Sequence, residues 1–330
     1  MKKLFILAAA ACVTLASCVK NEPVQTSGLG EAISFEDPIV SLNTKAGVAE
    51  VPASFLANRD FAVWAHHTTA EWDASNIAKT VWMNKVTITK IGEQWKNATS
   101  YYWPKEGYLH FSAYSPASVS ASIDATGITF ENYVVGQQAA QVDLLVSDRV
   151  TAKKSGVVPV VFNHILSAVN FIVKTTALNG PDFTLTGITV TGIKSKGTFN
   201  QGLTTAQNSQ LAVAEENDDR WSGQDVATSY PLTITQFEID NTGKYAHNGA
   251  AETSNEASLI LLPQSLENAK VVVNYTMEGV AQESTFNITG KWLRGYRYNY
   301  TIGFGADEIT FTPSADTWGD PQTGTIAPAQ

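Results

Sequence analysis

Short stretches in which apolar and polar residues alternate recur along most of this chain. In the first half they cover residues 61–66, 86–89 and 109–114, and the short apolar stretches 133–135 and 142–146 are expected to be two more strands. In the second half they cover residues 158–162, 169–173, 188–190, 232–234, 271–275, 286–288 and 296–304, with a further apolar stretch at 259–262. A period of two with one apolar face is typical of half-buried antiparallel strands. Because no helical runs lie between them, the pattern predicts an all-β protein made of sheet sandwiches.

Polar segments separate these strands into groups. Residues 148–156 are polar and basic and show no apolar periodicity, so we expect a domain boundary there. A chain of 330 residues is long enough for two ordinary domains. The expected domains are 46–155 and 156–330, with surface loops at 205–225 and 241–257.

The beginning of the chain has the pattern of an export signal. Lys2 and Lys3 precede an apolar run at residues 4–15, and small residues follow. The run is shorter than the ~20 residues of a membrane-spanning helix, and the order of segments is that of a secretory signal peptide. Leu-Ala-Ser-Cys, ending at Cys18, resembles the bacterial lipobox, which implies removal of residues 1–17 and acylation of Cys18. A plain secreted protein and an uncleaved anchor helix are the alternatives.

A first strand is expected after a short polar tether. Ile33 and Phe35 share one face of a segment that runs from Ala32 to Leu42, although Pro38 suits only a sheet edge or a bulge. A polar, glycine-bearing loop follows, with Lys45 as its basic residue. Exposed loop tips of this kind are where proteolytic nicking concentrates.

Charge and cysteine content exclude several classes of function. The formal net charge is −9, and the mature chain is more acidic still once Lys2 and Lys3 leave with the signal. Nucleic acid is not an expected partner, because phosphate binding needs a basic patch. Of the two cysteines, Cys12 leaves with the signal and Cys18 is acylated, so neither a disulfide nor a thiol nucleophile is expected.

A series of sequence blocks runs in order through residues 60–318. The blocks are Tyr101–Pro104, Leu109–Pro116, Gln141–Leu145, Val161–Ser167, Leu259–Gln264, Gly295–Tyr298, Ile309–Phe311 and Trp318. Together they resemble the fimbrillin family of Bacteroidales, the type V pilins and their Mfa-like relatives. The resemblance implies two tandem β-sandwich domains of transthyretin-like topology. It also implies a lipoprotein of the outer membrane, exposed at the cell surface, that assembles with other subunits into a fimbria.

The same resemblance implies a route of assembly. In that family a trypsin-like protease cuts after a basic residue in the loop that follows the first strand, and a strand of the next subunit fills the groove left behind. Lys45 has the expected position here, and Arg59 is the next candidate. Residues 18–45 are then the tether and a removable first strand. A sandwich that lacks a strand exposes backbone groups above an apolar slot, which a strand from a neighbour satisfies.

The segment that donates a strand is harder to identify. Residues 308–313 are expected to be the last strand of the second domain. The tail from Asp316 to Gln330 contains prolines and, after Trp318, only Ile326 as a sizeable apolar residue, so it is poor strand material. A weak donor is one interpretation, and a tip or accessory subunit that accepts a strand without donating one is the interpretation that we favour.

The residues give little support for catalysis, metals or cofactors. The chain has five histidines but neither a metalloprotease spacing nor any other catalytic or nucleotide-binding motif. His66 and His67 on one strand would point to opposite faces. The acidic run at residues 215–219 lacks the ligand spacing of a calcium loop, so a solvated loop is the simpler interpretation. We expect His164 and Trp103 to have structural roles.

Aromatic residues in the first domain suggest a second hypothesis. Trp72 is expected to be exposed and to stack on a sugar ring, whereas most aromatic residues of a sandwich belong to its core. A surface lipoprotein that stays acylated and binds a host or bacterial glycan or protein is therefore the alternative function. An enzyme such as a glycosidase ranks last, because no pair of carboxylates stands out.

Overall fold

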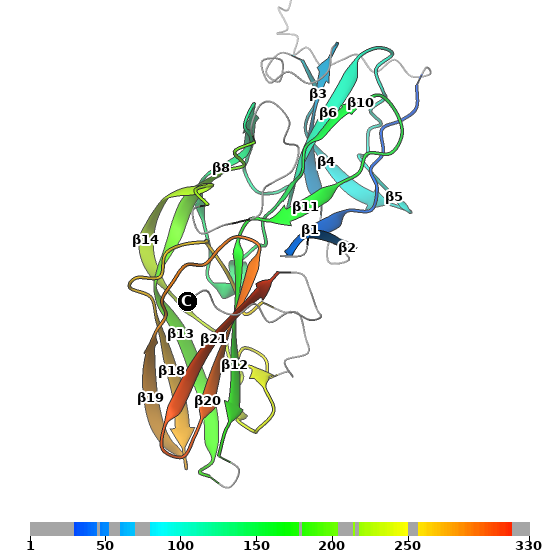
Figure 1. Ribbon diagram of the computed structural model, residues 1–330. Coiled ribbons are helices and arrows are strands. Elements are labelled where there is room, and N and C mark those ends of the chain that lie inside the picture. Colours follow the sequence, from blue (N-terminus) through cyan, green and yellow to red (C-terminus); the bar gives the residue numbers. More distant parts are fainter. Residues whose placement is uncertain are drawn as a thin grey trace, which may run out of the picture.

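The computed structural model describes residues 30–44, 47–52, 60–69, 80–177, 180–203, 214, 218–249 and 257–318. These residues form three β-sheets, and their only named helical element is the 3-10 turn Gln138–Ala140. The prediction of an all-β protein is therefore confirmed. Figure 1 shows a smaller lobe around β3, β4 and β6 and a larger lobe around β12, β13 and β20.

The smaller lobe is built on a mixed sheet. Its strands, in order across the sheet, are β2 (Gly47–Pro52), β1 (Ile39–Thr44), β11 (Val161–His164), β9 (Leu145–Ser147), β6 (Tyr108–Ser115), β3 (Phe61–Thr68), β4 (Val81–Ile91) and β5 (Gln94–Lys96), with β10 (Val150–Lys153) paired to β6. All pairs are antiparallel except β1 with β11, which is parallel.

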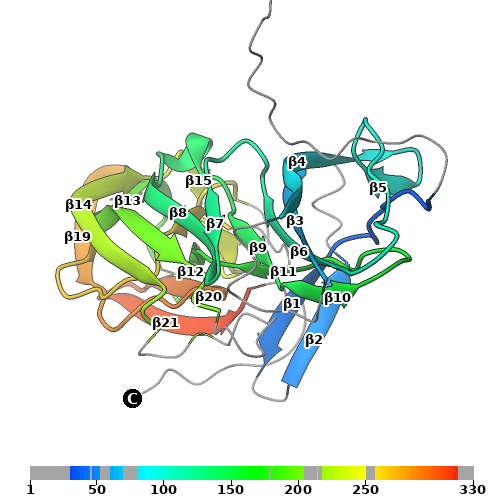
Figure 2. The same cartoon turned by 90° about the horizontal axis from the view of Figure 1, so that it is seen from above.

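The larger lobe is a sandwich of two further sheets, which Figure 2 shows as separate layers. One sheet has the order β16 (Lys244–Tyr245), β12 (Ser167–Thr175), β20 (Tyr296–Phe304) and β21 (Ile309–Thr317), with β17 (Leu259–Leu261) paired to β12. The other has the order β19 (Val280–Asn287), β18 (Lys270–Met277), β13 (Phe183–Asn200), β8 (Gly127–Val134) and β7 (Ser122–Asp124), with β14 (Trp221–Pro231) and β15 (Phe237–Glu238) paired to β13.

The sheets exchange strands across the expected domain boundary. β8 precedes residue 155 but pairs with β13 of the larger lobe, and β11 follows residue 155 but pairs with β9 of the smaller lobe. The division between the sheets therefore does not coincide with a single cut between residues 155 and 156. Two smaller predictions fail: residues 221–225, expected in a loop, begin β14, and residues 232–234, expected as a strand, follow its end.

The central strand of the smaller lobe is buried on both faces rather than half-buried. On one face, Phe61, Val63 and Ala65 of β3 belong to the core of the smaller lobe. On the other face, Ala62 and Trp64 belong to the core that runs into the larger lobe. A strand between two apolar layers needs two apolar faces, and the alternation of Phe, Ala, Val and Trp supplies them. β3 is thus the element through which the two lobes share their packing.

Candidate functional site

The first strand is part of the smaller lobe and not an exterior appendage. Regular pairing starts at Ile39, directly after Pro38, whereas Ala32 and Phe35 form isolated bridges. A proline donates no backbone hydrogen bond, which explains the interruption. β1 nevertheless lies between β2 and β11 and is not an edge strand. Pro38 thus divides the segment without moving it to the border of the sheet.

Backbone hydrogen bonds hold this segment from both sides. On one side, the Ile33 amide donates to the Tyr101 carbonyl at 2.7 Å and the Phe35 amide donates to the Trp95 carbonyl at 2.9 Å. On the other side, the Glu36 amide donates to the Val158 carbonyl and the Val158 amide donates to the Ser34 carbonyl, both at 2.9 Å. Removing the segment would therefore leave two rows of backbone groups without partners.

Three apolar side chains of the segment fill the core beneath it. Ile33, Phe35 and Val40 are at most 5% exposed and belong to the core cluster of the smaller lobe. The Phe35 ring packs edge-on against Phe61 and Phe111, with centroid distances of 5.8 and 5.9 Å. Fully burying an apolar side chain of this size stabilises a fold by about 1.5–3 kcal/mol. The segment is consequently an integral part of the lobe.

A polar contact fixes the segment at the position of Pro38. The Asp37 carboxylate accepts hydrogen bonds from the Lys90 ammonium at 3.1 Å and from the Trp95 indole at 2.9 Å. The bond from Lys90, followed by that from Trp95, lowers the pKa of Asp37. These contacts anchor one residue of the segment to β4 and β5, so that its register in the lobe is defined.

The segment is held by main-chain hydrogen bonds together with buried apolar side chains. This combination of main-chain hydrogen bonds and pockets for alternate side chains is the one by which extended segments add to a sheet. The next connection along the sequence, between the paired residues Thr44 and Gly47 of β1 and β2, contains Lys45. A cut there would separate the segment from the rest of the chain.

The residues that the sequence singled out lie outside this part of the structure. Cys18, Lys45, Arg59 and Trp72 all fall outside the described residues. Lipidation of Cys18, processing at Lys45 or Arg59 and ligand binding by Trp72 therefore stay predictions.

Several residues considered for chemistry have structural contacts. The His164 imidazole lies 3.0 Å from the Asp143 carboxylate and stacks on Trp318 with ring centroids 4.0 Å apart, which confirms a hydrogen-bonded structural histidine. Trp103 is buried, as expected. Asp218, at the end of the acidic run, pairs with Arg294 at 2.7 Å. Among the described residues, no group of three His, Cys, Asp or Glu side chains is placed to hold a metal ion.

Comparison with known proteins identifies the family. Residues 44–318 match the sequence profile of the Fimbrillin-like family. This protein belongs to that family. The match covers more than half of the chain and confirms the resemblance found in the sequence blocks. No curated protein matches the chain.

Solved structures share the fold of this fimbrillin-like protein. A fimbrial protein from Bacteroides vulgatus aligns with a TM-score of 0.57 at 16% identity, covering 87% of this chain and 100% of that one. Proposed cell adhesion proteins from Bacteroides ovatus and Bacteroides uniformis align with TM-scores of 0.55 and 0.51 at 17% and 15% identity. These alignments cover 88% and 87% of this chain and 99% of each of those chains. At such identities the likeness concerns the fold alone.

Membership of the Fimbrillin-like family places this protein among the structural proteins of cell-surface fimbriae. Other fimbrial subunits are the partners that such a family implies. Within the described residues, no helix is both long and apolar enough to cross a membrane.

Sequence reasoning did not identify the side chains that hold the segment before β1 in place. Asp37 and Lys90 are ordinary surface residues in the sequence, and Trp95 is one of many aromatic residues. Only the fold shows that the three meet, because they are separated by 53 and 58 positions along the chain. The proline at position 38 was an indirect signal only, since it marks an interruption in the hydrogen bonding of a strand.

Proposed function

We propose that this protein is a fimbrial subunit that is exported as a lipoprotein on Cys18 and assembled by donor-strand exchange. In this proposal a protease cuts after Lys45 and releases the segment that ends in β1. An extended segment of a neighbouring subunit then takes the vacated place. Head-to-tail use of unlike surfaces produces an open filament.

The observation that carries the proposal is the burial of Ile33, Phe35 and Val40 in the core of the smaller lobe. The loss of these side chains leaves an apolar slot, and the loss of the backbone bonds leaves unpaired amides and carbonyls beside it. A second support is that the family match covers residues 44–318. Nearly all of the segment that the proposed cut would release therefore lies before the part of the chain that matches the family.

The position within the fimbria is part of the proposal. The last described strand, β21, is already paired with β20 along its whole length, from Ile309 to Thr317. The residues after Trp318 are poor in apolar side chains and include two prolines, Pro321 and Pro328. We therefore favour a tip or accessory subunit that accepts a strand over a stalk subunit that also donates one.

The test is the N-terminal residue of the protein recovered from surface fimbriae. In wild-type cells, mass spectrometry is expected to find fimbrial chains that start at Ala46. In a Lys45→Gln variant, the chains are expected to stay unprocessed and to be absent from fimbriae. An Arg59→Gln variant is the matched control and is expected to be processed normally. Recovery of fimbriae whose subunits keep an acylated Cys18 would refute the exchange.

A further inference from the structure

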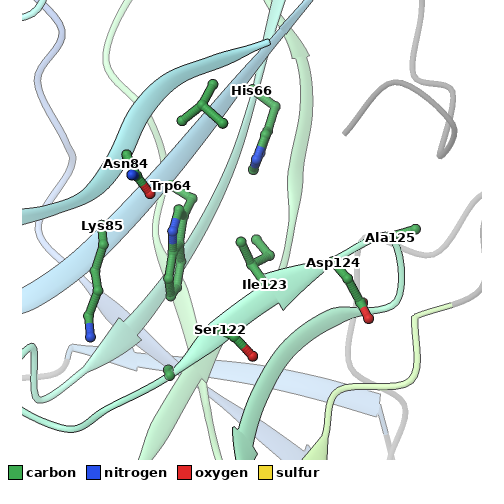
Figure 3. Close-up of a pocket in the computed structure, with 10 residues that line it drawn as sticks. Trp64, His66, Asn84, Lys85, Ser122, Ile123, Asp124 and Ala125 are labelled. Atoms are coloured by element: carbon green, nitrogen blue, oxygen red, sulfur yellow. The ribbon is translucent and has the colours of Figure 1, made fainter. Parts of the chain in front are cut away.

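A cavity of about 540 Å³ lies where the smaller lobe meets the β7–β8 hairpin. Its volume is in the range of small-molecule sites, which is about 300–1,000 Å³. Figure 3 shows Trp64 and His66 of β3 and Ile123 of β7 directed toward the same space. Residues of β4 border it on one side and residues of the hairpin on the other. The residues that line it are Trp64, His66, Val81, Asn84, Lys85 and 121–125.

The backbone of β4 is distorted where it borders this cavity. The register passes from Val63 opposite Val86 to Ala65 opposite Met83, so that Trp64 faces the two residues Asn84 and Lys85. Lys85 has a φ of 51°, a left-handed conformation that is uncommon for residues other than glycine. Bulges and strained residues of this kind re-aim side chains and cluster at functional sites. Here they bring the side chains of Asn84 and Lys85 to the cavity wall.

His66 is the polar group at the buried end of the cavity. It is 3% exposed, and it lines the cavity together with Trp64 of the same strand. Its ring nitrogens are not among the fully buried atoms that lack a partner, so they are open to the cavity. A ligand hydroxyl group in the cavity would supply them with a hydrogen-bond partner.

The charges around the cavity favour an anion. The Arg149 guanidinium lies beneath the hairpin, where it donates to the Ala125 carbonyl at 3.3 Å and lies 3.5 Å from the Ser112 hydroxyl. Lys85 adds a second cation at the wall, where its ammonium lies 3.5 Å from the Val119 carbonyl and 5.7 Å from the centre of the Tyr114 ring. Asp124 is the opposing charge, but its carboxylate already accepts the Thr126 amide and hydroxyl, each at 2.7 Å. The local balance is thus positive in a protein whose overall charge is −9.

We propose that this cavity binds a sugar unit that carries a carboxylate. Lys85 binds the carboxylate, while His66, Asn84 and Ser122 hydrogen bond to hydroxyl groups. Trp64 and Ile123 cover the apolar face of the ring, because sugars present both kinds of surface. Asp124 discriminates against ligands with several negative charges, such as an acidic peptide. The site lies away from the first strand, so the inference does not depend on strand exchange.

Calorimetric titration of the full-length protein with sialyllactose and with its neutral counterpart lactose tests the site. Sialyllactose is expected to bind at least fivefold more tightly than lactose. A Lys85→Asn variant, chosen because asparagine tolerates a positive φ, is expected to weaken sialyllactose binding at least tenfold. Lys105→Asn removes the same charge at an exposed position outside the cavity and is expected to change nothing.

A second variant distinguishes a change in ligand binding from a loss of structure. Asp124→Asn keeps an acceptor for Thr126 but removes the opposing charge, so sialyllactose is expected to bind about threefold more tightly. Loss of structure cannot produce such a gain. The proposal is overturned if neither sugar binds, if lactose binds as well as sialyllactose, if Lys85→Asn has no effect, or if an acidic hexapeptide is the preferred ligand.

Discussion

At the scale of single residues, the lobes contain charged and titratable groups that the core excludes from water. His66 and His110 are opposite each other on β3 and β6 and are buried, with Arg149 close by. The Ala152 amide donates to Nδ1 of His110 at 3.1 Å, while Nε2 lies 2.7 Å from the Thr68 hydroxyl. Nδ1 must therefore be unprotonated, which requires the neutral imidazole.

These histidines predict that acid weakens the fold. Burial lowers the pKa of both His66 and His110 to about 4, and the charge of Arg149 adds to the shift. In the unfolded chain these two histidines bind protons near pH 6.5. The stabilisation that comes from keeping them neutral is therefore complete above that pH and declines as the pH falls toward 4. We expect a loss on the order of 3 kcal/mol in the free energy of unfolding, measured by urea titration at pH 7 and pH 4.5. A His66→Gln/His110→Gln variant should lose most of this slope, and an unchanged slope would contradict the assignment.

A buried ion pair in the larger lobe leads to a second prediction. Arg294 is almost fully buried and pairs with Asp218 at 2.7 Å, while burial lowers the pKa of the guanidinium to about 10. Replacing Asp218 removes a charged hydrogen bond from the buried guanidinium, and breaking a buried pair costs up to about 3–5 kcal/mol. Asp218→Ala is therefore expected to lower the free energy of unfolding by about 3 kcal/mol in urea titration. Asp218→Asn, which keeps an acceptor, should cost less; equal costs would mean that the charge contributes little.

At the scale of elements, the segment of residues 30–44 is an integral part of the smaller lobe. It supplies Ile33, Phe35 and Val40 to the core and backbone bonds to both neighbours, yet it precedes the rest of the chain. It also pairs with β2, whose one partner among the described strands is β1. Its release would therefore remove the partner of β2 as well as part of the core.

A peptide of residues 30–44 is expected to bind back to protein from which this segment has been cleaved. Phe35 contacts two aromatic rings, and replacing a buried phenylalanine by alanine costs about 3–5 kcal/mol. The Phe35→Ala peptide should thus bind at least about 100-fold more weakly in fluorescence anisotropy. A Glu36→Ala peptide is the matched control, since Glu36 is exposed. Equal affinities of the Phe35→Ala and unmodified peptides would show that the pocket for Phe35 does not hold the segment.

The strands themselves were predictable, but their partners were not. Alternation identifies a face of a strand, and it located β3, β6, β12, β18 and β20. It cannot show which strands pair, so the exchange of β8 and β11 between the lobes had no sequence signal. The burial of β3 on both faces could not be predicted for the same reason, since the pattern is equally compatible with an exposed Trp64. The site residues Asp37, His66 and Lys85 depend on such pairings and could not be found beforehand.

At the scale of the whole molecule, two cores meet at one pair of strands. The core of the smaller lobe contains the first strand, Phe61 and Phe111. The other core extends from Trp64 and Tyr114, on the opposite face of β3 and β6, through both sheets of the larger lobe. Trp64 and Tyr114 stack with ring centroids 5.4 Å apart. The larger lobe therefore has a core of its own, distinct from the one that contains Ile33, Phe35 and Val40.

This division predicts how the molecule responds to cleavage after Lys45 and release of the segment. Hydrogen exchange is expected to accelerate in the strands that lose partners, chiefly β11 and residues 94–103, because their amides become accessible to water. β13 and β18 should keep their protection, since Ile33, Phe35 and Val40 of the segment belong to the other core. Adding the peptide of residues 30–44 should restore protection in the smaller lobe, whereas the Phe35→Ala peptide should not. Loss of protection in β13 and β18 as well would mean that β3 transmits the damage and that the two lobes unfold as one unit.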